Sequence, residues 1–204
     1  MAALYFFLNG GTMAEIGHIT ELKIVNSVLS VAGDNPVQSL SDSYQPVFII
    51  KQMIENISRD MQTEGWWFNT EFEVTLTSNT ETDKIALPFN ILKFEPKYTK
   101  YVQRGLTVYD RQARTSTITD DVEADIVVML EFDDLPQVAR KYIRAKCRHQ
   151  YNEEYFGEQT IKRTLEKELN KARIELEQAN LENNDYNVFN STKTYNMVYK
   201  NRRR

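Results

Sequence analysis

The sequence predicts an α+β fold. An antiparallel bundle of four helices in two pairs would carry an inserted small antiparallel β-sheet domain and end in an extended C-terminal tail. Apolar residues recur every three or four positions before residue 65 and again after residue 133, which is the period of amphipathic helices. Between these regions the apolar period changes to two, which is typical of strands. Helices, then strands, then helices is an element order found in α+β proteins.

The 204 residues are enough to bury a sizeable core, and we divide them into five segments. These are an N-terminal extension at 1–19, a first helical pair at 20–65, an inserted β-sheet domain at 66–132, a second helical pair at 133–183 and a C-terminal docking tail at 184–204. The apolar run Ala2–Leu8 in the extension is too short to span a membrane and lacks the features of a signal peptide. The extension is either an extended tail or a strand donated to a neighbouring subunit, and Met13 could be the native start.

The first helical pair begins with a helix at Glu21–Ala32, for which Thr20 is a suitable N-cap. A second helix is predicted at about Ser43–Glu64, capped by Ser41 or Asp42. Its buried stripe consists of five apolar residues at helical spacing: Val47, Ile50, Ile54, Ile57 and Met61.

The inserted domain begins after Gly65, where the apolar residues fall on alternate positions: Trp66, Phe68, Phe72, Val74 and Leu76. Further short strands are predicted at 84–87, 92–95, 101–103, 106–110 and 124–132. Arg104 and Gly105 would form the turn of a hairpin.

The second helical pair begins at Asp134, a suitable N-cap, with Pro136 just inside the helix. One face of its first helix carries Val138, Tyr142, Ala145, His149, Asn152 and Phe156, and Gly157 ends it. One side of the next helix carries Ile161, Leu165, Leu169, Ala172, Leu176 and Ala179. The short break makes the two helices antiparallel neighbours, and we expect Asn183–Asp185 to end the helical pattern.

The composition argues against DNA binding, metal binding and catalysis. The net charge of −4 disfavours a general DNA-binding surface, and the two histidines and one cysteine show no metal-ligand spacing. His149 reads as a core or interface residue and Cys147 as a small helix residue, with a reactive thiol as the alternative for Cys147. We predict no catalytic, metal or cofactor site.

Acidic residues cluster at Asp120, Asp121, Glu123 and Asp125, and again at Glu131, Asp133 and Asp134. We interpret both clusters as solvated ends of loops; a cation site or an acidic rim on a channel are the alternatives.

Four blocks of residues occur in an order and spacing that characterise one known family. They are Gly65-Trp66-Trp67-Phe68-Asn69; Tyr101-Val102-Gln103-Arg104-Gly105; Val108-Tyr109-Asp110-Arg111; and a run from Asp134 and Pro136 through Ile143, Arg148 and Gln150-Tyr151-Asn152 to Tyr155-Phe156-Gly157. Over roughly Leu22–Asn190 the chain resembles the tail tubular protein A family, the gatekeepers or head-to-tail adaptors of autographivirus-type short-tailed phages.

The resemblance implies a structural virion protein of the portal-proximal tail, assembled in the host cytoplasm. Proteins of this family form a dodecameric ring between the portal and the tail nozzle, extend the DNA channel, and help retain and eject the genome. Their helical part builds the ring wall, while the sheet region packs against neighbours. We therefore expect a homo-oligomer with two protein partners, the portal protein and the nozzle (tail tubular protein B). Double-stranded DNA would pass without specific binding, and no membrane partner is expected.

Two groups of residues are the candidate contact sites. The tail would dock on the portal through Tyr186, Phe189, Tyr195, Tyr199, Arg202, Arg203 and Arg204. Contacts between subunits, or structural packing, are expected from Trp66, Trp67, Phe68, Arg104, Tyr109, Arg111, Tyr155 and Phe156.

Two other functions compete with this interpretation. A tail-associated saccharide or peptidoglycan hydrolase would use paired carboxylates, for example from the Asp120–Asp134 region. A DNA-binding terminator of packaging would need a basic stripe, which neither the net charge nor the helix patterns indicate.

Overall fold

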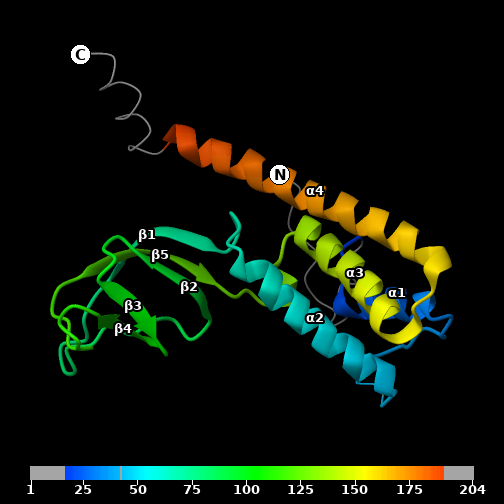
Figure 1. The fold of residues 1–204 in the computed structure, drawn as a ribbon, viewed down its shortest axis with the longest axis horizontal. Helices are drawn as coiled ribbons and strands as arrows, with labels where there is room; N and C mark the ends of the chain where they lie inside the picture. Colours follow the sequence, from blue (N-terminus) through cyan, green and yellow to red (C-terminus); the bar gives the residue numbers. More distant parts are fainter. Residues whose placement is uncertain (1–16, 42, 191–204) are drawn as a thin grey trace, which may run out of the picture.

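The structure is a computed structural model that describes residues 17–41 and 43–190, with only the backbone described for 185–190. Its helices form one body and its strands form a second unit beside it, joined at the C-terminal end of α2 (Figure 1). The mixed helix-and-sheet class is therefore confirmed. The predicted N-terminal strand or anchor lies outside the described residues, apart from its last few positions. None of the described helices is long and apolar enough to cross a bilayer.

The helices α1 (Glu21–Val31) and α2 (Gln45–Thr63) form where the apolar periodicity placed them. The side chain of Thr20 accepts a hydrogen bond from the Lys23 backbone N–H, so the predicted cap of α1 is confirmed. The predicted cap of α2 is wrong: the helix starts later, at a Tyr44 N-cap with no side-chain cap bond. All five residues of the predicted stripe on α2 are buried.

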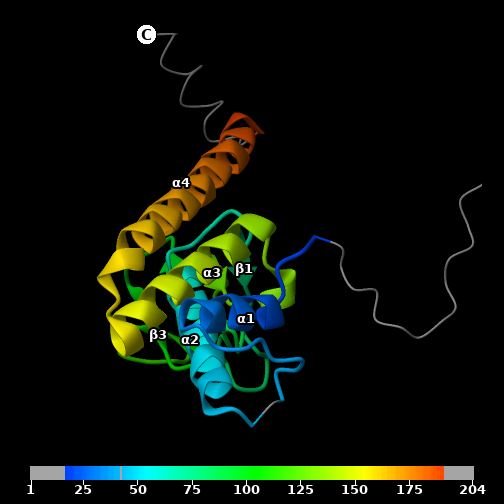
Figure 2. The same ribbon diagram turned by 90° about the vertical axis from the view of Figure 1, so that its right-hand side faces the viewer.

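The helix α3 (Gln137–Tyr151) is the centre of the helical body, because it contacts α1, α2 and α4 (Figures 1 and 2). Ala139, Ile143 and Cys147 are fully buried on it. The predicted cap by Asp134 is wrong, because Asp134 belongs to a 3-10 turn at Phe132–Asp134 and Pro136 occupies the N-cap position. Pro136 fits there because proline has no N–H group to leave unsatisfied.

The end of α3 widens into one turn of π-helix, Asn152–Phe156, before Gly157 ends it with a positive φ of 62°. The Gly157 backbone N–H donates to the carbonyl of Asn152 over 2.6 Å. A π turn adds one residue to the helical repeat and so shifts the face that follows. Phe156 is consequently 49% exposed, and its predicted place on the same face as Val138 is wrong.

The long helix α4 (Gln159–Asn190) returns antiparallel to α3 and continues beyond it (Figures 1 and 2). Leu165, Ala172 and Leu176 are buried along its inner side, as predicted. The predicted helix break at Asn183–Asp185 is wrong, because the helical backbone runs through these residues to Asn190.

The sheet unit has two layers. One is an antiparallel sheet in the order β1-β5-β2, made of Thr70–Leu76, Val122–Val128 and Ile91–Pro96. The other is the hairpin of β3 (Tyr101–Arg104) and β4 (Thr107–Asp110), whose turn at Gly105–Leu106 confirms the predicted hairpin within one residue. Ile85, Tyr101 and Val108 of the hairpin layer pack against Leu76, Ile91 and Phe94 of the sheet.

Three details of the predicted sheet are wrong. A bulge follows Glu71 in β1, where Glu73 has a φ of 54°, and it turns Phe72 outward to 59% exposure. The segment 84–87 makes only isolated bridges, although Ile85 and Leu87 are buried as a strand would bury them. The last strand ends at Val128, because Phe132 belongs to the 3-10 turn.

Three amide side chains hold the junction between the helical body and the sheet unit, and we call them the amide clasp: Gln62, Asn69 and Asn90. They bind three consecutive residues, Val128–Leu130. The Asn69 and Asn90 backbone carbonyls accept from the N–H groups of Val128 and Met129 over 2.9 and 2.7 Å, and their side-chain amides donate back to the carbonyls of the same residues over 2.9 Å.

The third member, Gln62, binds Leu130 through its side chain, and its backbone carbonyl accepts from the Asn69 side-chain amide over 2.9 Å. Its amide oxygen accepts from the Leu130 N–H over 2.8 Å, and its amide nitrogen donates to the Leu130 carbonyl over 3.1 Å and to the Ser58 hydroxyl over 3.0 Å. Gln62 has no exposed surface. Buried polar groups this completely paired favour one relative orientation of the two units.

Gly65 is required where α2 leads into this junction. Its φ is 83°, and an added Cβ would lie 3.2 Å from a Val127 methyl group and 3.3 Å from the Thr70 hydroxyl. Both the backbone conformation and the available space therefore favour glycine.

Replacing Gln62 by alanine should lower the free energy of unfolding by about 2 kcal/mol, because the part-buried N–H and carbonyl of Leu130 would lose their partners. Chemical denaturation followed by circular dichroism measures this. Gln52→Ala on the exposed side of the same helix is the matched control and should change stability by less than about 0.5 kcal/mol. Equal effects of the two variants would contradict a role for the clasp.

Candidate assembly interface

An exposed aromatic patch lies at the end of the helical body where α2 begins and α3 ends. We call it the aromatic end patch: Tyr44, Tyr155 and Phe156, which are 42%, 51% and 49% exposed. The Tyr155 and Phe156 rings lie 4.9 and 5.8 Å from the ring of Tyr151, which is itself buried. Exposed aromatic side chains supported by a buried ring are typical of protein contact surfaces.

Trp66, Trp67 and Phe68 lie at the junction and pack into the core. Trp66 is buried, and its indole N–H donates to the Met61 carbonyl over 2.7 Å. The Trp67 backbone N–H donates to the Asn180 side chain of α4 over 3.1 Å. These contacts within the chain are consistent with structural packing, and a contact of Trp67 and Phe68 with a neighbouring subunit stays a prediction.

Arg173 anchors α4 to the same place. Its guanidinium donates to both carboxylate oxygens of Glu64 over 2.8 and 2.7 Å and lies 5.1 Å from the Trp66 ring. Beyond this anchor, the α4 side chain of Leu181 is 63% exposed. The part of α4 beyond this anchor therefore presents an exposed apolar side chain.

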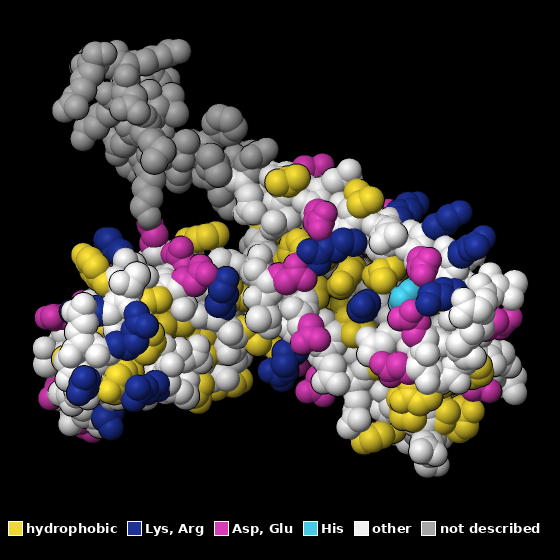
Figure 3. Space-filling model, in the orientation of Figure 1, with side chains coloured by type: hydrophobic (Ala, Val, Ile, Leu, Met, Phe, Trp, Pro, Cys, Tyr) yellow, Lys and Arg dark blue, Asp and Glu magenta, His cyan; other side chains and the backbone are white. Residues whose placement is uncertain are grey.

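Arg104, Tyr109 and Arg111 come together on the β3–β4 hairpin. The Arg104 guanidinium stacks over the Tyr109 ring at 3.5 Å, and Arg111 donates to the Thr99 carbonyl over 2.6 Å. Figure 3 shows Lys and Arg side chains gathered over this part of the sheet unit. The sequence grouped these residues through a resemblance, and the structure places them on one surface.

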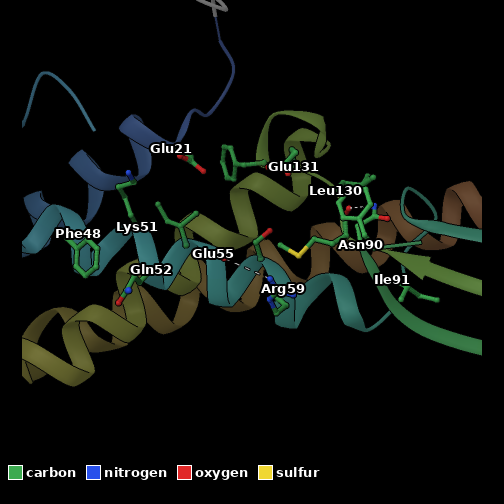
Figure 4. Close-up of a pocket in the computed structure, with 15 residues that line it drawn as sticks. Glu21, Phe48, Lys51, Gln52, Glu55, Arg59, Asn90, Ile91, Leu130 and Glu131 are labelled. Carbon is green, nitrogen blue, oxygen red and sulfur yellow. Dashed lines mark hydrogen bonds and ion pairs between the residues drawn. The ribbon is translucent and has the colours of Figure 1, made fainter. Parts of the chain in front are cut away.

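A groove of about 630 Å³ runs along the exposed side of α2 to the loops that lead to the sheet unit (Figure 4). Three carboxylates line it, those of Glu21, Glu55 and Glu131, and Lys51 and Arg59 lie between them. Burial, together with the neighbouring Asp133 carboxylate, raises the pKa of Glu21. The groove therefore contains a carboxyl group that takes up a proton more readily than an exposed one.

The two predicted acidic clusters lie at opposite ends of β5. Asp120, Asp121 and Glu123 are exposed at its start, and Glu131, Asp133 and Asp134 are exposed after its end. At about 3.3 Å per residue the strand keeps them roughly 20 Å apart, so they do not face each other across one cleft. No cluster of His, Cys, Asp or Glu suited to a metal ion occurs among the residues that the structure describes.

The structure describes only some of the residues predicted to dock on the portal. The backbones of Tyr186 and Phe189 belong to α4, whereas Tyr195, Tyr199 and Arg202–Arg204 lie outside the described residues. Their docking role therefore stays a prediction.

Sequence reasoning missed the buried Arg140 of α3. Its side chain donates to the carbonyls of Leu135 and Ile19 over 2.8 and 3.1 Å, and so ties the chain before α1 to the start of α3. Arginine is rarely buried unless it is paired, and here backbone carbonyls satisfy it. In the sequence, Arg140 directly follows Ala139, which the structure buries completely. The predicted apolar face of this helix ran through other residues, so neither Ala139 nor Arg140 was expected to be buried.

Comparison with known proteins identifies one family. The family model described as "Tail tubular protein" matches residues 22–186, which is most of the chain. The chain is also 28% identical over 126 residues to tail tubular protein A of Klebsiella phage KP34; the match covers 60% of this chain and 66% of the relative's length.

Cys147 should be unreactive in the folded protein. Its side chain is fully buried, and burial raises the pKa of its thiol, so the reactive thiolate is scarce and inaccessible. A thiol-specific chromogenic reagent should label none of the native protein at pH 8 or 9, and one thiol per chain after unfolding in denaturant. Rapid labelling of the native protein would contradict this and favour the reactive-thiol interpretation.

Proposed function

Because the chain belongs to the tail tubular protein family, it is a structural component of a phage tail, and we propose that it forms the adaptor ring between the portal and the tail nozzle. The ring is a dodecamer of this chain and prolongs the DNA channel. It helps retain the packaged genome and then lets it leave. Its place is the portal-proximal tail of the virion, after assembly in the host cytoplasm.

One observation in the described residues supports this proposal most directly. Apolar side chains are uncovered at several separate places of the described chain, among them the aromatic end patch and the α4 surface around Leu181. A closed ring of identical chains needs two different contact patches on each subunit, because the front of one copy meets the back of the next. The chain offers two such patches.

The proposed partners follow from this arrangement. The portal protein would take the end of α4 and the segment after it, and the nozzle protein would contact the other rim of the ring. With −4 per copy the assembled ring is strongly acidic, so double-stranded DNA would pass it without specific binding. The proposed role requires no catalysis by the chain.

The ring can be tested by removing the aromatic end patch. The double variant Tyr155→Ser/Phe156→Ser should weaken each subunit contact by about 2 kcal/mol or more, because both side chains are half exposed in the single chain. Electron microscopy and sedimentation velocity of the purified protein measure this loss.

The conservative pair Tyr155→Phe/Phe156→Leu keeps the apolar area and is the matched control, which should assemble normally. A wild-type chain that stays monomeric both alone and with its portal would refute the ring.

Portal docking is tested by truncation after Asn184. The shortened protein should unfold like the full chain, because the cut lies beyond Arg173 and Asn180, through which α4 binds Glu64 and Trp67, but it should no longer bind the portal. Pull-down with purified portal measures binding. Deletion of residues 1–12 is the control and should leave binding intact. Unchanged portal binding after the truncation would contradict docking by the tail.

A second candidate function rests on the groove along α2. Its three carboxylates and the raised pKa of Glu21 resemble the requirements of a saccharide or peptidoglycan hydrolase, in which one carboxyl group is the acid. Such an enzyme should release reducing sugar ends from capsular polysaccharide or peptidoglycan. Glu21→Gln and Glu131→Gln should each abolish release, whereas Glu95→Gln on the sheet should not. Absence of release by the wild-type ring would exclude this function.

A further inference from the structure

The outer face of the β3–β4 hairpin is basic. We call it the basic face: Lys84, Lys100, Arg104 and Arg111 around Tyr109. Strand pairing puts them on one side, because Val102 lies opposite Tyr109, Arg104 opposite Thr107, and Ala86 also opposite Thr107. The alternate residues Ile85, Tyr101 and Val108 point inward and are buried.

The charges of this face are largely unneutralised within the chain. Among the described residues, no carboxylate forms an ion pair with Lys84, Arg104 or Arg111, and Lys100 reaches only Asp110 at 3.7 Å. Two of the four cations are held in place, Arg104 by the Tyr109 ring and Arg111 by the Thr99 carbonyl. A cation held in place without a counter-charge is prepared to meet an anionic partner, since less side-chain entropy is lost on binding.

The other layer of the same unit has an acidic outer face. We call it the acidic face: Asp121, Glu123 and Asp125 of β5 and its approach, with Glu95 of β2. Glu95 lies opposite Asp125, and these positions alternate with the buried Val122, Ala124 and Ile126. Lys93 and Lys97 neutralise part of this charge by pairing with Glu95 and Glu123. The remaining balance is negative.

The two charged faces point in opposite directions, because the inner sides of the two layers pack on each other. A thin unit with a positive front and a negative back is complementary to its own copy in a head-to-tail arrangement. That is the arrangement which cyclic symmetry imposes on a ring.

We propose that the basic face of each sheet unit docks on the acidic face of the sheet unit in the next copy, so that the sheet units form a second, electrostatic ring of contacts. This inference rests on the proposed ring and specifies its interface. A second copy is favoured over nucleic acid because every copy supplies the complementary face. In addition, Tyr98 and Leu106 at the margin of the basic face are 59% and 49% exposed, which suits a protein partner.

Charge reversal tests the inference. Lys84→Glu/Arg104→Glu makes both faces negative, and Asp121→Lys/Glu123→Lys makes both faces positive. Each variant alone should assemble at least about tenfold more weakly than wild type, because like charges then meet at every contact. An equimolar mixture of the two should recover assembly as an alternating ring, since every contact in it is again complementary. Sedimentation velocity and electron microscopy at low salt measure both.

The matched control is Lys167→Glu/Lys171→Glu on α4, which makes the same change in charge away from the sheet unit and should assemble as wild type. Circular dichroism confirms that each variant is folded. Wild-type rings with unimpaired single variants, or a mixture that fails to recover, would overturn this inference and leave the proposed ring standing. Normal assembly of Lys84→Glu/Arg104→Glu with loss of duplex DNA binding would also overturn it and assign the basic face to nucleic acid. A chain that never forms rings would overturn both proposals.

Discussion

The amide clasp is the constraint on which the rest of the structure depends. The helical body and the sheet unit have separate apolar cores, and the chain crosses between them along 65–69 and 129–131. At this crossing Gln62, Asn69 and Asn90 bind both polar groups of each residue from Val128 to Leu130. Apolar contacts alone are not directional, whereas paired hydrogen bonds fix an orientation. The position of the sheet unit beside the helices is thus set by a few buried polar bonds.

A fixed orientation matters because ring contacts are demanding. In a closed ring every subunit contact has the same geometry, so a small error in the angle between the two units would be repeated around the circle. The helical body contributes rigidity of its own, since α3 packs against the other three helices and Arg173 anchors α4 beside Trp66. Exposed apolar side chains are then left where these contacts end, at the aromatic end patch and near Leu181.

Sequence periodicity predicted the elements well and their ends less well. The apolar stripe of α2 and the sheet positions Val74 and Leu76 follow from burial, which a single sequence displays as a period. The start of α2, the π turn before Gly157 and the bulge at Glu73 depend on local geometry that has no period, so they escaped prediction. The polar run Asn183–Asp185 looked like a helix end, yet α4 continues through it. Helix propensity is a weak signal for such residues.

The candidate contact surfaces were likewise predicted only in part. Tyr155 and Phe156 were found through a resemblance, but their exposure depends on a π turn that the pattern did not reveal. The net charge of −4 did not reveal the basic face, because net charge sums the positive and negative residues of all surfaces. Lys84 is separated in sequence from Arg104 and Arg111, and only the pairing of 84–87 with β4 brings it to their side. Net charge therefore bounds how a whole chain behaves toward DNA, whereas topology decides where charge gathers and which partner it can meet.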